Sequence, residues 1–233
     1  MMNRALVSAI LLALAAATPA GAATRSYTVT SFSRVRVEGP YAVAIQTNRG
    51  PFARATGDAA ALDRVKLRVE GTTLVVSADP GGWGGYPGAP AGPVRIEAGT
   101  AVVASAVVNG AGSLDIDRVR GLEFGLNIQG SGVAGIADVQ VDRLRIGLAG
   151  SASVRVEGKA LALTAVVRGP GSLDATGLPV RDAVIGAEGP AVVKASVSGT
   201  AKVDAAGLAA VQLNGNPSCQ LKVVGTATVD GCR

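Results

Sequence analysis

Glycine recurs at a nearly constant interval along the second half of this 233-residue chain, and no other feature constrains the fold as strongly. Segments of the type Gly-small-small-apolar return about every twenty residues, with alternating apolar and polar residues between them. A fixed period of this size is typical of stacked units that bury their apolar faces only against one another. We expect a coil of short strands with glycine at each corner. The leading glycines are Gly110, Gly130, Gly150, Gly169 and Gly189, and Gly215 follows after a longer interval.

Small aliphatic side chains dominate the apolar residues. Hydrophobic residues make up 48% of the sequence, yet it contains only three Phe, three Tyr and one Trp. An interior of Ala, Val and Leu suits thin, regular layers. One unit per period returns each strand to the same direction, whereas hairpins would alternate direction. We therefore predict an all-β fold in which 94–233 forms a right-handed parallel β-helix or β-solenoid-like coil, with a β-sandwich or meander as the alternative.

Residues 23–78 form an N-terminal strand region that we expect to pack with the repeat as one domain. Apolar and polar residues alternate there, as in Arg34-Val35-Arg36-Val37-Glu38, which is typical of half-buried strands. Gly39-Pro40 separates two strands that form a hairpin or a bent strand pair, and Gly71-Thr72 lies at a second turn. The prediction is a small antiparallel or mixed sheet, with a short helical turn at 58–62.

Residues 79–93, DPGGWGGYPGAPAGP, are nearly all Gly, Pro and Ala. Its prolines lack backbone N–H donors and its glycines and alanines offer little to pack, so the segment predicts a loop. It holds the only Trp of the chain, Trp83, with Tyr86 close by. This aromatic pair is a candidate contact for a sugar or a partner, and the alternative is a pair of side chains that tuck against the body of the protein.

Residues 1–22 have the three parts of a secretory signal peptide. Arg4 gives a basic start, an apolar run extends from Ala5 to Ala17, and small residues ending at Ala22 provide the cleavage site. No later segment approaches about 18 consecutive apolar residues, so we expect a soluble mature chain, without a transmembrane span, in the periplasm or outside the cell. Loss of Arg4 changes the formal net charge from +5 to +4. The basic residues are scattered and lack interleaved aromatics, so we expect no nucleic-acid partner.

The two cysteines, Cys219 and Cys232, lie close to the C-terminus. Thiols of an exported protein meet an oxidising compartment, so we predict that these two form a disulfide. A bridge across so short a loop would stabilise the fold by about 3 kcal/mol in the chain-entropy model. It would also hold the last turn of a repeat array, where an open end tends to fray.

Histidine is absent, which removes His-based catalytic triads and the commonest zinc sites. The remaining candidates are carboxylates: Asp115 and Asp117 share one face of a predicted strand, and Asp174 occupies the repeat position equivalent to Asp115. Such carboxylates could hold Ca²⁺ or carry out acid-base chemistry on a polysaccharide. The alternative is a solvent-facing ladder or a set of turn caps. The sequence contains no phosphate-binding or calcium-loop motif, and we predict no metal site and no cofactor.

The recurring glycine corner, with strand pairs between its copies and the preceding segment VKLRVEGTTLVVSA, resembles the bacterial family named "putative auto-transporter adhesin, head GIN domain". The resemblance covers about Ser33 to Gly225. It implies a β-helix-like fold in a secreted or periplasmic protein, and it supplies no catalytic motif. The chain departs from the family pattern where proline follows the corner, at Gly169-Pro170, Gly189-Pro190 and Asn216-Pro217.

These observations favour a non-enzymatic exported protein of the cell envelope. It would be an adhesin-like or scaffold-like binding module whose flat coil faces contact a cell-surface glycan or an envelope protein, and self-association is a further option. The alternative function is a polysaccharide-active β-helix enzyme that uses the carboxylates of Asp115, Asp117 and Asp174.

Overall fold

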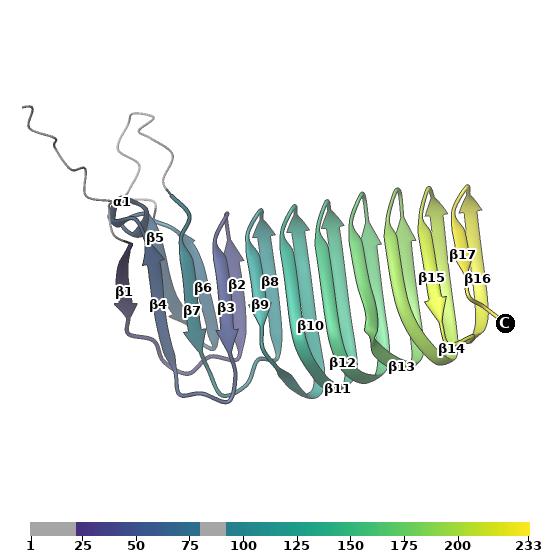
Figure 1. Cartoon of the computed structure of the whole chain (residues 1–233), viewed down its shortest axis with the longest axis horizontal. Helices are drawn as coiled ribbons and strands as arrows, with labels where there is room; N and C mark the ends of the chain where they lie inside the picture. The colour runs from purple at the N-terminus through teal and green to yellow at the C-terminus, as the bar shows by residue number, and fades with distance from the viewer. Residues whose placement is uncertain (1–21, 80–91) are drawn as a thin grey trace, which may run out of the picture.

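The computed structural model describes residues 22–79 and 92–233. Most of these residues lie in strands, and the strands stack into a coil along the length of the molecule (Figure 1). Each turn of the coil contributes one strand to each of two faces, and parallel pairing joins it to the turns on either side. The β-solenoid predicted from the glycine period is confirmed. The expected signal peptide lies outside the described residues, apart from Ala22.

We call the two faces face A and face B. Face A contains β5 (Val65–Glu70), β6 (Thr73–Ala78), β2 (Arg34–Glu38), β8 (Ser105–Gly110) and β16 (Ser218–Gly225). Face B contains β1 (Ala23–Tyr27), β4 (Phe52–Gly57), β7 (Arg95–Gly99), β3 (Ala42–Gln46), β9 (Ser113–Ile116), β15 (Ala210–Asn214) and β17 (Thr228–Asp230). The strands at the centre of the molecule are long and bend round the wide corner onto face A; they are β10 (Val119–Gly130), β11 (Val133–Gly150), β12 (Ser153–Arg168), β13 (Ser172–Glu188) and β14 (Val192–Gly207).

The core lies between the two faces and consists of ladders of aliphatic side chains. On face B one ladder passes through Leu114, Ala134, Val154, Leu173, Val193 and Val211, all of them buried. Neighbouring positions along each strand point outward and are mostly polar, as the period of two in a strand requires. Burial of each such side chain contributes about 1.5–3 kcal/mol, so stacking supplies the main driving force for the fold.

The tight corners, at the top of Figure 1, form a column of glycines. Gly130 has a φ of 114°, and a Cβ at this position would lie 2.7 Å from the carbonyl oxygen of Gly110 in the adjacent coil. Gly150 has a φ of 102° and stands in the same relation to Gly130, at 2.5 Å. Glycine is therefore required both by the left-handed backbone and by the close approach of the next layer. Gly169 and Gly189 continue the column with φ values of 89° and 79°.

The interpretation of Gly215 as a further copy of this corner is wrong. The column continues from Gly189 through Gly207 and Gly225, which pair with each other in register and are spaced more closely than the earlier corners. Gly215 does have a positive φ of 99°, but it packs against the backbone of Val197 on the opposite, wide corner. The last coils are shorter than the others. The long interval runs from Gly189 at a tight corner to Gly215 at a wide corner, so it is not a repeat of the same corner.

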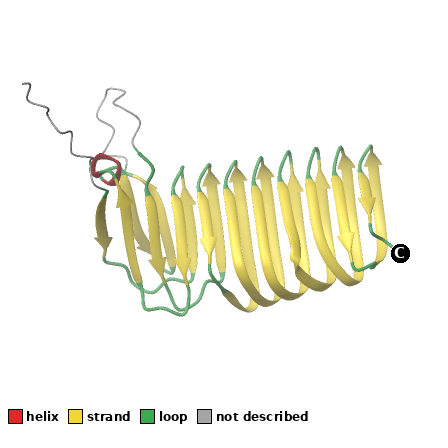
Figure 2. Ribbon diagram, viewed as in Figure 1, coloured by secondary structure: helices red, strands yellow, loops and turns green. Residues whose placement is uncertain are grey.

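The N-terminal strands form a mixed sheet that extends the coil. Of the two predicted alternatives around Gly39-Pro40, the bent pair is correct, because β2 pairs with β6 and β8 while β3 pairs with β7 and β9. Strands β5 and β6 form the antiparallel hairpin expected around Gly71. Figure 2 shows the single short helix, α1 (Ala59–Leu62), at this end of the described chain.

Candidate functional site

A shallow, open hollow of about 420 Å³ lies on the outer surface of face B, over β3, β9 and the first halves of β11 and β12. Small side chains leave this space, since Ala44 and Gly135 occupy outward positions of the two coils that flank the coil of Asp115. Charged and polar side chains border it. We call it the face B groove and define it by Gln46, Asp115, Asp117, Gly135, Arg155 and Glu157.

A single ladder of outward positions crosses the groove. Asp115, Gly135, Arg155 and Asp174 occupy this ladder in consecutive coils. Because Gly135 has no side chain, Asp115 and Arg155 face each other across an empty position, about 9.6 Å apart at two strand spacings. A Cβ at Gly135 would lie 2.9 Å from Asp115 Oδ1, so the carboxylate leans over the glycine. The groove therefore offers an acceptor and a donor from the coils on either side of Gly135, with the acceptor leaning over the glycine.

Arg155 and Glu157 form the second side of the groove. Arg155 Nε donates a hydrogen bond of 3.0 Å to Glu157 Oε1, and both side chains are largely exposed. This ion pair in β12 engages one N–H group of the guanidinium and leaves the others without a hydrogen bond to any residue of the described chain.

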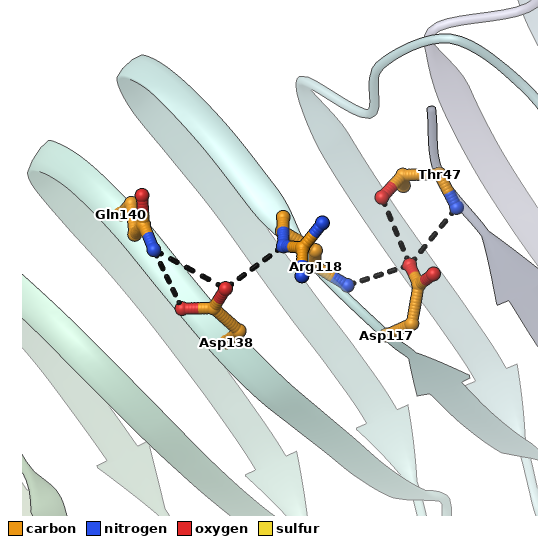
Figure 3. Close-up of polar contacts among 5 residues, drawn as sticks. All are labelled: Thr47, Asp117, Arg118, Asp138 and Gln140. Carbon is orange, nitrogen blue, oxygen red and sulfur yellow. Dashed lines mark hydrogen bonds and ion pairs between the residues drawn. The ribbon is translucent and has the colours of Figure 1, made fainter. Parts of the chain in front are cut away.

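Asp117 belongs to a chain of polar contacts that runs along the wide corner (Figure 3). Its Oδ1 accepts hydrogen bonds from Thr47 N and Thr47 Oγ1, both at 2.9 Å, and from Arg118 N at 2.6 Å. Arg118 Nε in turn donates to Asp138 Oδ2 at 2.8 Å, and Gln140 Nε2 lies 3.0 Å from Asp138 Oδ1. Arg118 and then Gln140 hold the pKa of Asp138 below its ordinary value. One carboxylate oxygen of Asp117 is thus occupied by hydrogen bonds that connect neighbouring coils.

Asp174 caps a local turn. Its Oδ1 accepts hydrogen bonds from Thr176 Oγ1 at 2.6 Å and Thr176 N at 3.1 Å, and these bonds lower the pKa of Asp174. It lies three coils from Asp115 in the ladder, about 14 Å away at the strand spacing. Carboxylate pairs that hydrolyse glycosidic bonds are separated by about 5–9.5 Å. Asp115 and Asp174 therefore do not form such a pair.

The face B groove brings together only part of the predicted site. Asp115 and Asp117 line it, Asp174 lies outside it, and Trp83 and Tyr86 lie outside the described residues. The residues flanking the 79–93 segment end β6 and begin β7 at the glycine-corner edge of the molecule. Sequence reasoning missed Arg155, although the repeat register that equates Asp115 with Asp174 also aligns Arg155 with both.

A second hollow of about 450 Å³ lies on face A, where Gly125 and Gly147 occupy outward positions between polar side chains that include Asn127, Arg145 and Arg168. Both of these arginines are paired with glutamates, Arg145 with Glu123 and Arg168 with Glu188. The two hollows differ in charge, because carboxylates border the face B groove directly.

No group of three or more His, Cys, Asp or Glu side chains within 22–79 and 92–233 is arranged to hold a metal ion. In the same part of the chain, no helix has the length and apolar character needed to cross a membrane. The two cysteines form the predicted disulfide, with Cys219 and Cys232 Cα atoms 5.8 Å apart.

The sequence of this chain matches a known protein family. Residues 31–217 match the model of the family described as "Putative auto-transporter adhesin, head GIN domain". No curated protein has a matching sequence.

Several crystal structures have a similar fold. A "putative lipid binding protein" from Parabacteroides distasonis is 18% identical with a TM-score of 0.72, and the match covers 90% of this chain and 96% of the other. A "putative adhesin" from Bacteroides fragilis is 14% identical with a TM-score of 0.72, covering 89% and 93%. A "putative adhesin" from Parabacteroides merdae is 16% identical with a TM-score of 0.65, covering 90% and 95%. At these identities the likeness establishes the fold.

Proposed function

Because the chain belongs to the putative auto-transporter adhesin, head GIN domain family, we propose that it is an exported, non-enzymatic binding module of the bacterial cell envelope. The signal-like pattern of residues 1–22 supports export, and solved proteins of the same fold bear adhesin names. The periplasm or the cell exterior is the proposed location. The proposed ligand is a cell-surface glycan.

The observation that carries this proposal is the composition of the face B groove. Vicinal sugar hydroxyls donate to carboxylates and accept from guanidinium groups, so an acceptor and a donor that face each other across bare backbone suit a sugar ring. Asp115 supplies the acceptor and Arg155 the donor, with Gly135 between them.

An acyl chain is a poorer fit to this molecule, although one protein of similar fold is named for lipid binding. Lipid tails need an apolar cavity that buries most of their surface. The space between faces A and B is occupied by the protein's own aliphatic ladders, and the face B groove is bordered by charge. A polar ligand on the outer surface is therefore the better match.

The enzyme alternative has little geometric support. Asp117 Oδ1 is occupied by three donors, and Asp174 is both engaged by Thr176 and distant from Asp115. Asp115 alone remains as a carboxylate of the groove without a hydrogen-bonded partner within the described chain, and a single carboxylate does not provide the acid and base pair that hydrolysis uses.

A glycan array followed by calorimetry of the hits tests the proposal. We expect Arg155→Ala and Asp115→Asn to weaken binding about tenfold or more, since each removes a charged hydrogen-bonding partner of the ligand. Gly135→Leu should also weaken binding, because its side chain would fill the strip between them. Arg168→Ala on face A is the matched control and should leave affinity unchanged.

Circular dichroism would verify that each variant is folded. Binding that is lost in Arg168→Ala but retained in Arg155→Ala and Asp115→Asn would refute the assignment to face B. Steady release of reducing ends from a bound polysaccharide, abolished by Asp115→Asn, would replace the binding module with the enzyme.

A further inference from the structure

The C-terminal end of the coil presents an open strand edge. Within the described residues, β16 pairs with β14 on one side and with no strand on the other. β17 likewise pairs with β15 alone. Each of these edges carries a row of backbone N–H and C=O groups with which a further strand could pair. In monomeric proteins such an exposed edge favours association.

The side chains of this last coil continue the core ladders into solvent. Val203 is completely buried, whereas Leu221, its neighbour in the same ladder, is 49% exposed. Ala205 is 1% exposed and its neighbour Val223 is 44% exposed. These residues face the core of the coil, and they are exposed because no further coil of the described chain lies over them.

The C-terminal tail covers only one part of this opening. The Cys219–Cys232 disulfide draws the tail across the inner side of the last coil, and Arg233 N donates to Pro217 O at 3.2 Å. Both contacts lie at the start of β16, near the wide corner, and the tail is seen there beside the last strands in Figure 1. Leu221 and Val223, further along β16, stay uncovered.

We infer that this end is the contact surface of a symmetric dimer, in which β16 pairs antiparallel with β16 of a second copy. A register centred on Leu221 places Leu221 opposite its counterpart and Cys219 opposite Val223, so that core-facing residues meet core-facing residues. The same register places Lys222 opposite Gln220, which keeps the two lysines out of direct opposition. The tail of each copy then lies against the uncovered part of the other.

The chain's other end does not fit the same role. There α1 and the ion pair between Arg25 and Asp63, with an N–O distance of 2.6 Å, close the core. The outer strand of face A at that end is β5, whose exposed Lys66 would repel Lys222 in a head-to-tail stack, while Arg68 of the same strand is paired with Glu70. Contact between two C-terminal ends avoids this repulsion and closes at two copies.

The area of the contact surface limits the affinity of the dimer. An eight-residue edge is about 27 Å long and the two faces are about 10 Å apart, so the contact buries roughly 300 Å² per copy plus the flanking side chains. This is below the range of permanent dimers. The dimer is therefore weak and concentration-dependent, as suits a protein that could be concentrated on a surface.

Sedimentation equilibrium of the purified protein, from about 10 μM to about 1 mM, tests the inference. We expect a dimer that accumulates with concentration and no larger species. Leu221→Lys should abolish it, and an unchanged melting temperature would verify the fold. Leu122→Lys is the matched control, because Leu122 is 73% exposed at the wide corner, away from the end, and should leave the dimer intact.

Gln220→Glu gives a second, independent readout at an exposed position. The new carboxylate of each copy lies opposite Lys222 of the other, so the substitution creates two ion pairs per dimer. It should tighten association about fivefold at low salt, a gain that high salt removes. A protein that stays monomeric at about 1 mM, a series of assemblies that grows beyond two, or a dimer unaffected by both Leu221→Lys and Gln220→Glu would overturn the inference.

Discussion

The two ends of the coil are closed in different ways. At the N-terminal end, antiparallel strands replace the parallel stacking, and α1 inserts Ala61 and Leu62 into the core, where both are 2% exposed. At the C-terminal end the parallel stacking continues to the last strand, and a disulfide holds the tail across part of the opening. One end is closed by a folded lid, whereas at the other a covalent link holds a tail that covers only part of the opening.

The difference shows what a repeating coil cannot do for itself. Each layer covers the one before it, so the core is complete everywhere except at the first and last layers. Glycine corners and aliphatic ladders specify how layers stack, but they do not determine how the first and last layers are covered. The lid at the N-terminal end requires residues of a different kind, such as those of the short helix α1 within 23–78.

Leu62→Ala is expected to have the largest effect on stability among the changes that compare the two ends. The side chain is buried in the lid, so its truncation should cost about 3 kcal/mol and lower the melting temperature of the whole coil. Leu221→Ala, the matched change at the exposed end, should cost less than about 0.5 kcal/mol. Urea unfolding at low protein concentration, where the monomer prevails, measures both values. Equal losses would mean that the two ends are closed equally well.

Replacement of Cys219 and Cys232 by serine should have a smaller and more local effect. The bridge closes a loop with a sequence separation of 13, so the chain-entropy model sets its contribution at about 3 kcal/mol at most, and only the last coil bears the loss. Hydrogen exchange should increase in β16 and β17 and remain slow at Val154 and Leu173. Faster exchange throughout the coil would show that the link stabilises the entire stack. Mild reduction of the unchanged protein is the control.

Acid should produce the smallest effect, and it should be located away from the disulfide-linked end. Arg68 lowers the pKa of Glu70 in the N-terminal hairpin, as Arg118 does for Asp138 at the wide corner. A carboxyl whose pKa is lowered by folding stabilises the protein above its unfolded pKa, and that stability is lost as the pH falls through the folded pKa.

We therefore expect the melting temperature to decline as the pH falls below about 4. The double variant Glu70→Gln/Asp138→Asn should start lower at neutral pH and decline less. Calorimetry between about pH 7 and about pH 2 measures both curves. An identical decline in the variant would assign the acid response to other groups.

The coil itself could be predicted from the sequence because its signal is local and repeated. Gly110, Gly130 and Gly150 recur at an interval typical of stacked coils, and the disulfide follows from two cysteines in a chain expected to be exported. The short helical turn before Asp63 was also predictable from its place between two strand patterns.

Other features depend on contacts between distant parts of the chain. The β2–β3 coil lies between β6–β7 and β8–β9, an order that the sequence order conceals. Gly207 and Gly225 escaped notice because the last coils are shorter, which breaks the period. The face B groove could be found only once the register placed Arg155 across Gly135 from Asp115.

The column of glycine corners also makes the length of the molecule adjustable in fixed steps. Because the central coils follow similar backbone paths, a duplicated segment such as 133–152 could be inserted with little change to the coils on either side. Each duplication would lengthen the rod by about 4.8 Å and extend both faces by one strand. The length of the coil can therefore change in evolution in steps of one strand spacing, while its two ends stay the same.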